Sequence, residues 1–169
     1  MDIGKTPELF SDATECVPTW CTQQPADPGS NAARLLFDVL YVDNNEDDQL
    51  FVKAACRRVG SPFAFRCADT AKEATRILEA AQNGDGSLPD LILLEVRLPS
   101  DEGFDMLKYV RSQPLLNPIP LVVYTDALDP KVLERARKLG ADLILKKEPN
   151  FEIGKKLLKA VKEMCFRAP

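Results

Sequence analysis

The stretch that decides the fold is Pro89-Asp90-Leu91-Ile92-Leu93-Leu94-Glu95-Val96-Arg97-Leu98-Pro99. In it, an unbroken apolar run is followed by one carboxylate, Glu95, and then by a loop. Such a run is typical of a central parallel strand with both faces covered. Open α/β sheets keep their sites at the carboxyl ends of their strands. Glu95 is therefore the first candidate functional residue.

Strand and helix patterns alternate five times from residue 34 onward. The expected strands are 35–42, 63–68, 91–95, 121–124 and 143–145. The expected helices are 46–59, 71–82, 103–113, 130–139 and the segment that begins near 151. Strands separated by helices imply right-handed crossovers and a parallel sheet. The pattern predicts an α/β, flavodoxin-like, doubly wound five-stranded sheet with five helices and the order 2-1-3-4-5. Its crevice lies between strands one and three.

Capping residues punctuate these helices. Thr70 and Glu73 form a capping-box pattern, and Asp129 precedes Pro130 as expected at a helix start. Gly140 is a helix-stop signal, and Asn150 is expected to cap the last helix. In the first helix, the apolar spacing predicts an inward stripe. Its members are Leu50, Phe51, Ala54, Ala55 and Val59.

Composition limits the class of protein. The 169 residues are 45% hydrophobic and carry a net charge of -4, so no overall basic footprint favours nucleic acid. The sequence contains neither an apolar run long enough to span a membrane nor the apolar stretch of a signal peptide. We expect a cytoplasmic protein without a membrane or nucleic-acid partner. Lys146-Lys147 and Lys155-Lys156 are interpreted as solvated ends of a strand and a helix.

The first 33 residues differ from the rest of the chain. They contain Pro7, Pro18, Pro25 and Pro28 and show no lasting period, which favours a flexible extension before a domain at 34–169. An alternative is a segment that docks through Val17 and Trp20.

The five cysteines are odd in number and the chain has no His, which argues against a structural zinc site. Cys56 and Cys67 are expected to be small core residues, and a disulfide between Cys16 and Cys21 is not expected.

Four motifs in order give a family resemblance over about residues 35–165. They are Val42-Asp43-Asn44-Asn45-Glu46-Asp47, the stretch 89–99 with Gly103, Thr125 at the end of strand four, and Gly140-Ala141-Asp142 through Lys147. Together they resemble the receiver domain of two-component response regulators. The resemblance implies a site in which acidic residues after strand one hold Mg²⁺ and an Asp after strand three accepts a phosphoryl group. It also implies that a hydroxyl residue and a lysine bind the phosphoryl oxygens.

Carried onto this sequence, the resemblance assigns roles residue by residue. Glu95 stands at the phosphoacceptor position. Asp43, Asn44 and the backbone carbonyl of Arg97 stand at the acidic metal site. Thr125, Ile144 and Lys147 stand at the positions that respond to phosphorylation in the family. Asp43 is then the remaining anionic candidate for Mg²⁺, and no cofactor is expected.

The sequence departs from the family pattern at these same positions. Glu95 reaches about 1.5 Å further than an Asp, while in-line transfer tolerates little misplacement. Asn44 replaces the second metal-binding acid, and Asp126 places a carboxylate where the phosphoryl group would lie. Because Glu148 separates Lys147 from Pro149, the usual Lys-Pro bond is lost and a trans peptide is expected.

These departures favour a single-domain, degenerate receiver that is not an enzyme and binds proteins without phosphorylation. We expect Glu95 to form an internal ion pair with Lys147. The expected partner is a histidine kinase or another signalling protein, and the fourth helix, fifth strand and fifth helix form a face through which the family often dimerises. That face would carry Lys131, Glu134, Arg135, Lys138, Lys155, Lys159 and Lys162. Two alternatives stay open: a working Mg²⁺-dependent switch with an unusual acceptor, and an unrelated flavodoxin-like ligand-binding protein.

Overall fold

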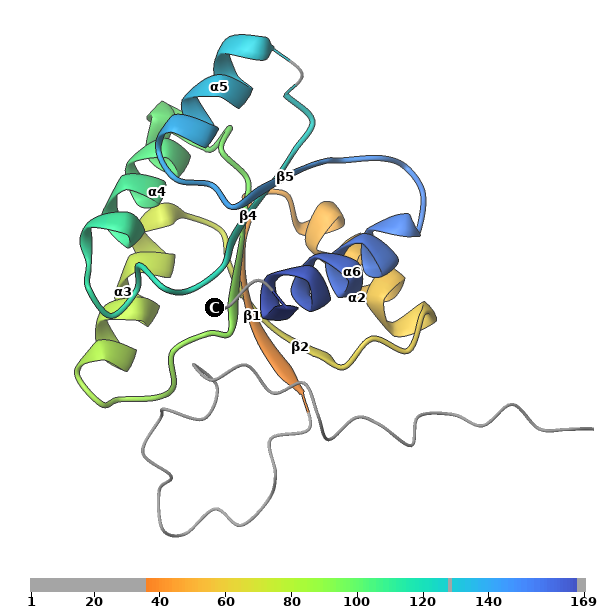
Figure 1. Cartoon of the computed structure of the whole chain (residues 1–169), viewed down its shortest axis with the longest axis horizontal. Helices are drawn as coiled ribbons and strands as arrows, with labels where there is room; N and C mark the ends of the chain where they lie inside the picture. Colours follow the sequence, from red (N-terminus) through yellow and green to blue (C-terminus); the bar gives the residue numbers. More distant parts are fainter. Residues whose placement is uncertain (1–35, 128, 167–169) are drawn as a thin grey trace, which may run out of the picture.

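A computed structural model describes residues 36–127 and 129–166, apart from the side chains of residue 162 and residues 164–166. The predicted extension, with its Val17–Trp20 segment and its two cysteines, lies outside these residues. Helices cover both faces of one central sheet (Figure 1). Among the described helices, none is long and apolar enough to cross a membrane.

The sheet has the predicted order, β2-β1-β3-β4-β5, and every pair of neighbouring strands is parallel. The strands are β1 (Phe37–Val42), β2 (Phe63–Ala68), β3 (Leu91–Leu94), β4 (Leu121–Thr125) and β5 (Leu143–Lys146). All four residues of β3 are buried, as the apolar run predicts for the central strand. β2 and β5 form the two edges. The flavodoxin-like topology is therefore confirmed.

Five α-helices connect and follow the strands in the described part of the chain. They are α2 (Glu46–Arg58), α3 (Ala71–Gln82), α4 (Glu102–Ser112), α5 (Pro130–Lys138) and α6 (Glu152–Phe166), with a short 3-10 turn, η1 (Pro99–Asp101), before α4. Helices α3, α4 and α5 cover one face of the sheet, and α2 and α6 cover the other (Figure 1). Two separate apolar clusters result, one on each side of the sheet.

The helix ends follow the capping signals. The Thr70 hydroxyl accepts from Glu73 N, while the Glu73 carboxylate accepts from Asp69 N, one residue earlier than in a standard capping box. Asp129 accepts from Lys131 N at the start of α5. Gly140 adopts a φ of +96° just after α5, the left-handed conformation that glycine tolerates.

The predicted stripe on α2 is partly wrong. Leu50 is 63% exposed and Ala54 is also exposed. The buried residues are instead Gln49, Val52, Ala55 and Cys56. The helix face that contains Leu50 and the helix face that contains Val52 both carry apolar residues. Hydrophobic periodicity alone therefore does not decide which of the two faces of α2 is buried. Packing against α6 selects the second face, because Gly154 lies so close to Ala55 that a Cβ at residue 154 would be 2.7 Å from the Ala55 carbonyl oxygen.

Candidate functional site

Four sequence-predicted residues meet at the carboxyl edge of the sheet. Asp43, Glu95 and Lys147 directly follow β1, β3 and β5, and Thr125 ends β4. Backbone hydrogen bonds continue the parallel register past the strand ends. Glu95 N donates to the Val42 carbonyl at 2.9 Å, and Lys147 N donates to the Thr125 carbonyl at 2.8 Å. The register therefore brings side chains from four strands together.

The Asp43 carboxylate is fully buried and its oxygens all have donors. Its Oδ1 accepts from Asn45 N at 3.0 Å. Its Oδ2 accepts from the Tyr41 hydroxyl at 2.7 Å and from Lys147 Nζ at 2.7 Å. A buried carboxylate needs such donors to offset its lost hydration. Asp43 is therefore held as a fixed, fully satisfied anion.

The Glu95 carboxylate is also buried and is engaged on both oxygens. Its Oε1 accepts from the Thr125 hydroxyl at 2.6 Å and from Arg97 N at 2.7 Å. Its Oε2 lies 3.0 Å from Lys147 Nζ. The predicted internal ion pair with Lys147 is thus present in the structure. The extra methylene of Glu, relative to Asp, places the carboxylate against the hydroxyl and the lysine.

Lys147 is the cation of this cluster. Its ammonium contacts Asp43, Glu95 and also Asp48, whose Oδ2 lies 2.9 Å away. Burial lowers the pKa of Lys147, but the three carboxylates more than offset this, so the pKa is raised above that of an ordinary lysine. Three carboxylates around one ammonium give the cluster an excess of negative charge.

Sequence reasoning missed two members of the cluster. Asp48 lies in the first turn of α2, where the helix starts beside the sheet edge, and its side chain is 35% exposed. Tyr41 precedes Asp43 by two residues, so both side chains point to the same face of the sheet. That spacing is a signal that could have identified Tyr41 as a donor. Burial, followed by the charge of Asp43, raises the pKa of the Tyr41 hydroxyl.

Other predicted site residues lie outside the buried cluster. Asn44 is exposed, and so is the side chain of Asp126, which approaches Arg97 Nη1 at 3.9 Å. Ile144 is half-buried and packs on the cluster beneath α3, α4 and α5. The peptide bonds of the described residues are all trans, in line with the expectation for Lys147-Glu148.

Gly103 fixes the loop that follows Glu95. A Cβ at this position would lie 2.6 Å from Val96 Cα and 2.7 Å from the Glu95 carbonyl oxygen. The start of α4 therefore packs directly on the backbone of the candidate site. Ser100 and Asp101, just before α4, both have positive φ, at 58° and 61°. Two consecutive residues in this region make a tight turn at an energetic cost.

The donor set does not fit a divalent cation as it stands. Every oxygen of Asp43 already accepts a hydrogen bond, the Lys147 ammonium lies between Asp43 and Glu95, and Asn44 is exposed. Over the described ranges, no group of three or more His, Cys, Asp or Glu side chains is arranged to hold a metal. Mg²⁺ requires several oxygens in near-octahedral order, which this arrangement does not offer.

Comparisons with known proteins agree with the architecture. A probable methanogenesis regulatory protein, FilR2, of Methanothrix harundinacea is 29% identical over 127 residues, which is 75% of this chain and 82% of that protein. The two-component response regulator ORR1 of Oryza sativa subsp. japonica is 31% identical over 113 residues, 66% of this chain. The match spans 48% of ORR1, so this chain corresponds to about half of the rice protein.

A solved structure shares the fold. The Mn²⁺-bound form of response regulator Rcp1 aligns with a TM-score of 0.63 at 20% identity, over 79% of this chain and 96% of that one. The family described as the response regulator receiver domain matches residues 39–162. Since that match covers most of the chain, and the strand order and carboxyl-edge cluster agree with it, the chain belongs to the response regulator receiver domain family.

Proposed function

We propose that this chain is a degenerate receiver, a protein-binding module that acts without being phosphorylated. One observation carries the proposal: both oxygens of the Glu95 carboxylate are occupied, by Thr125, Arg97 N and Lys147. The hydroxyl and the ammonium are the groups that the family uses for phosphoryl oxygens. Here the Glu95 side chain itself supplies the oxygens that those groups bind.

Charge also supports the proposal. An incoming phosphoryl donor would approach Asp43, Asp48 and Glu95, which share a single ammonium. Like charges in a partly desolvated site repel strongly. Asp126 adds a further carboxylate beside Thr125 at the rim. Rcp1 was solved with Mn²⁺; in this chain the oxygens that would ligate such an ion already accept from protein donors, so we derive no phosphoryl transfer through a metal.

Receiver domains are signalling modules that interact with histidine kinases or other signalling proteins, and the family match places this chain among them. We extend this to a non-enzymatic, cytoplasmic protein with a receiver unit at 34–169 and an extension at 1–33. A homodimer through α5, β5 and α6 belongs to the same proposal. The family assignment removes the unrelated flavodoxin-like protein as an alternative.

The decisive experiment is incubation of the full chain with acetyl phosphate and Mg²⁺, followed by intact-mass measurement. We expect no covalent phosphoryl adduct. The matched variant is Asn44→Asp/Glu95→Asp, which restores the family's two acidic residues after β1 and its shorter acceptor side chain. We expect this variant to gain a phosphoryl adduct. A stable adduct on the unmodified chain that disappears in Glu95→Gln would overturn the proposal.

A second candidate function is a working switch with Glu95 as acceptor. The observation that favours it is the convergence of Asp43, Glu95, Thr125 and Lys147 in the order that the family's chemistry uses. This candidate requires that Mg²⁺ displace Lys147 from Asp43. A Mg²⁺-dependent change in the fluorescence of Tyr41 and Tyr124, measured after Trp20→Phe, would favour it, and the absence of any change would favour the degenerate receiver.

A further inference from the structure

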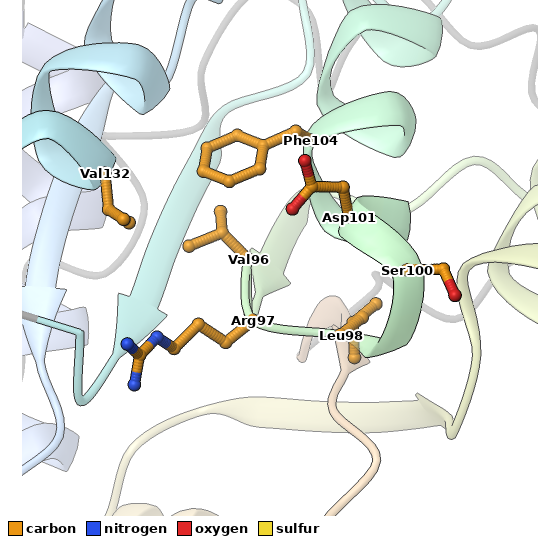
Figure 2. A pocket seen from close by; sticks show the side chains of 7 residues that line it. All are labelled: Val96, Arg97, Leu98, Ser100, Asp101, Phe104 and Val132. Atoms are coloured by element: carbon orange, nitrogen blue, oxygen red, sulfur yellow. The ribbon is translucent and has the colours of Figure 1, made fainter.

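A shallow groove lies beside the loop that follows Glu95. Val96, Arg97, Leu98, Ser100, Asp101, Phe104 and Val132 line it. Figure 2 shows Val132 of α5 on one side and the 96–101 loop on the other, with Phe104 and Val96 directed into the space between them. Arg97 extends along the lower rim in this view. The apolar side chains at the base of the groove are almost fully buried, with Val96 1% and Phe104 3% exposed, and charged side chains form its rims.

Two arginines stand at those rims. The Arg97 side chain is 59% exposed, and its nearest carboxylate, Asp126, is 3.9 Å away and itself exposed. Arg135 ion-pairs with Asp101 at 2.8 Å and lies over the Phe104 ring at 3.9 Å. An exposed pair at nearly 4 Å contributes little, so Arg97 can exchange Asp126 for another carboxylate at small cost.

A second hollow lies between α4 and α5. This hollow is lined by Lys108, Lys131, Glu134, Arg135, Lys138 and Leu139. Helix α5 carries four cations and one carboxylate, in a chain whose net charge is -4. Helix α5 therefore carries a net positive charge beside these hollows. Among the described residues, no carboxylate lies within ion-pair distance of the Lys131 ammonium.

We propose that the groove between the 96–101 loop, α4 and α5 is a docking surface for an acidic segment of a partner protein. The segment carries a bulky apolar residue between carboxylates. Its apolar side chain packs against Val132, and its carboxylates pair with Arg97 on one side and with Lys131 and Lys138 on the other. This surface shares the α5 residues with the α5, β5 and α6 face, and it differs from that face by using the 96–101 loop and α4 in place of β5 and α6.

The proposed groove is connected to Glu95 through the backbone. Arg97 N donates to Glu95 Oε1 at 2.7 Å, so the carboxylate holds the residue whose guanidinium forms the rim. Asp101 and Arg135 then tie the same loop to α5 at 2.8 Å. The docking surface is therefore shaped in part by the fixed Glu95 carboxylate.

The test is a titration of the full isotope-labelled chain with the synthetic peptide Glu-Glu-Leu-Phe-Glu-Glu, followed by amide chemical shifts. We expect shifts confined to residues 96–104 and 130–139. Arg97→Glu/Lys131→Glu should weaken binding about tenfold or more, and added salt should weaken binding to the unmodified chain. The matched control is Lys72→Glu/Arg76→Glu at exposed positions on α3, which should leave binding unchanged.

Several outcomes would overturn the proposal. One is equal binding of the peptide Lys-Lys-Leu-Phe-Lys-Lys, and another is a set of shifts outside the groove. Absence of binding at millimolar peptide would do the same. Binding that appears only when Glu8 and Asp12 are changed to Gln would assign the groove to the chain's own amino-terminal segment. Self-association lost in Arg97→Glu/Lys131→Glu would assign it to a second copy.

Discussion

Lys147 Nζ lies 3.0 Å from Glu95 Oε2 although their strands, β5 and β3, are separated by β4. The same ammonium reaches one strand further, to Asp43 after β1, at 2.7 Å. One side chain therefore joins the ends of three strands. Glu95 is almost fully buried and the Lys147 side chain is only 14% exposed, and this burial makes the pair sensitive to substitution.

Removing the cation should be the most damaging change in the cluster. Lys147→Met leaves three carboxylates without their shared ammonium, and we expect a loss of about 3–5 kcal/mol in the free energy of unfolding. Glu95→Gln should cost less, about 1–2 kcal/mol, because the amide oxygen still accepts from Thr125 and Arg97 N. Urea denaturation of the two single variants and the double variant measures both effects.

The double variant supplies the control for that prediction. Residues in one ion-pair network are expected to be non-additive, so Glu95→Gln/Lys147→Met should be less destabilised than the sum of the single variants. Lys159→Met, at an exposed position on α6, should change stability by less than about 0.5 kcal/mol. Strict additivity in the Glu95–Lys147 cycle would contradict a coupled pair.

Tyr41→Phe tests the donor that the sequence did not reveal. The variant removes the hydroxyl that donates to Asp43 Oδ2 at 2.7 Å and leaves the ring packing in place. We expect a loss of about 1.5–3 kcal/mol, because the bond is made to a buried charged group. Tyr109→Phe is the matched control, since its hydroxyl makes only a 3.4 Å contact to Gln82. Equal effects of the two variants on the urea midpoint would argue against a special role for Tyr41.

Stability should fall at alkaline pH. The pKa of Lys147 is raised in the folded state, so its contribution is complete below the ordinary lysine pKa of about 10.4 and is lost as pH rises through the folded value. Burial also raises the pKa of Tyr124 to about 12, so the unfolded chain ionises first and is favoured above pH of about 10. Burial also raises the pKa of the Cys56 thiol to about 12. Unfolding free energies measured from neutral pH to about pH 11 should therefore begin to decline at about pH 9, where the unfolded-state thiol ionises, and should decline more steeply above about pH 10.

A spectroscopic measurement checks the same prediction independently. Tyrosinate absorbance of the folded protein should stay low until pH exceeds the ordinary tyrosine pKa of about 10, and should rise together with unfolding. Lys147→Met should flatten part of the alkaline decline. A decline that begins near neutral pH would point to groups other than Lys147 and the buried tyrosines.

Gly103→Ala should disturb both the fold and the candidate site. The added methyl group would lie 2.6 Å from Val96 Cα, so backbone must shift and we expect a loss of about 3 kcal/mol. Gly84→Ala is a useful comparison, because it meets no atom within 4 Å and suffers only from its φ of +87°. Its expected cost is about 1 kcal/mol. A smaller effect at Gly103 than at Gly84, measured by thermal melting, would contradict the close packing.

The strands, their order and most helix ends could be predicted from the sequence. Hydrophobic periodicity and capping residues are local signals, and the crossover rules then restrict the order of the strands. The sequence also predicted the Glu95–Lys147 pair, since parallel strands place their carboxyl ends together. It failed for Leu50 on α2, where two apolar faces compete and the contact with Gly154 of α6 decides. It also missed Asp48, because its reach to Lys147 depends on how the first turn of α2 meets the sheet. The groove at Arg97 requires the positions of α4 and α5, which no local pattern encodes.

The ammonium that joins three strand ends carries a further consequence for regulation. If Glu95 permanently supplies the oxygens that Thr125 and Lys147 bind, as proposed, then no phosphatase could return this receiver to an inactive state. Its influence on a pathway would then scale with how much of the protein the cell makes and how fast the cell degrades it. Control would move from the rate of a chemical modification to the rates of synthesis and turnover.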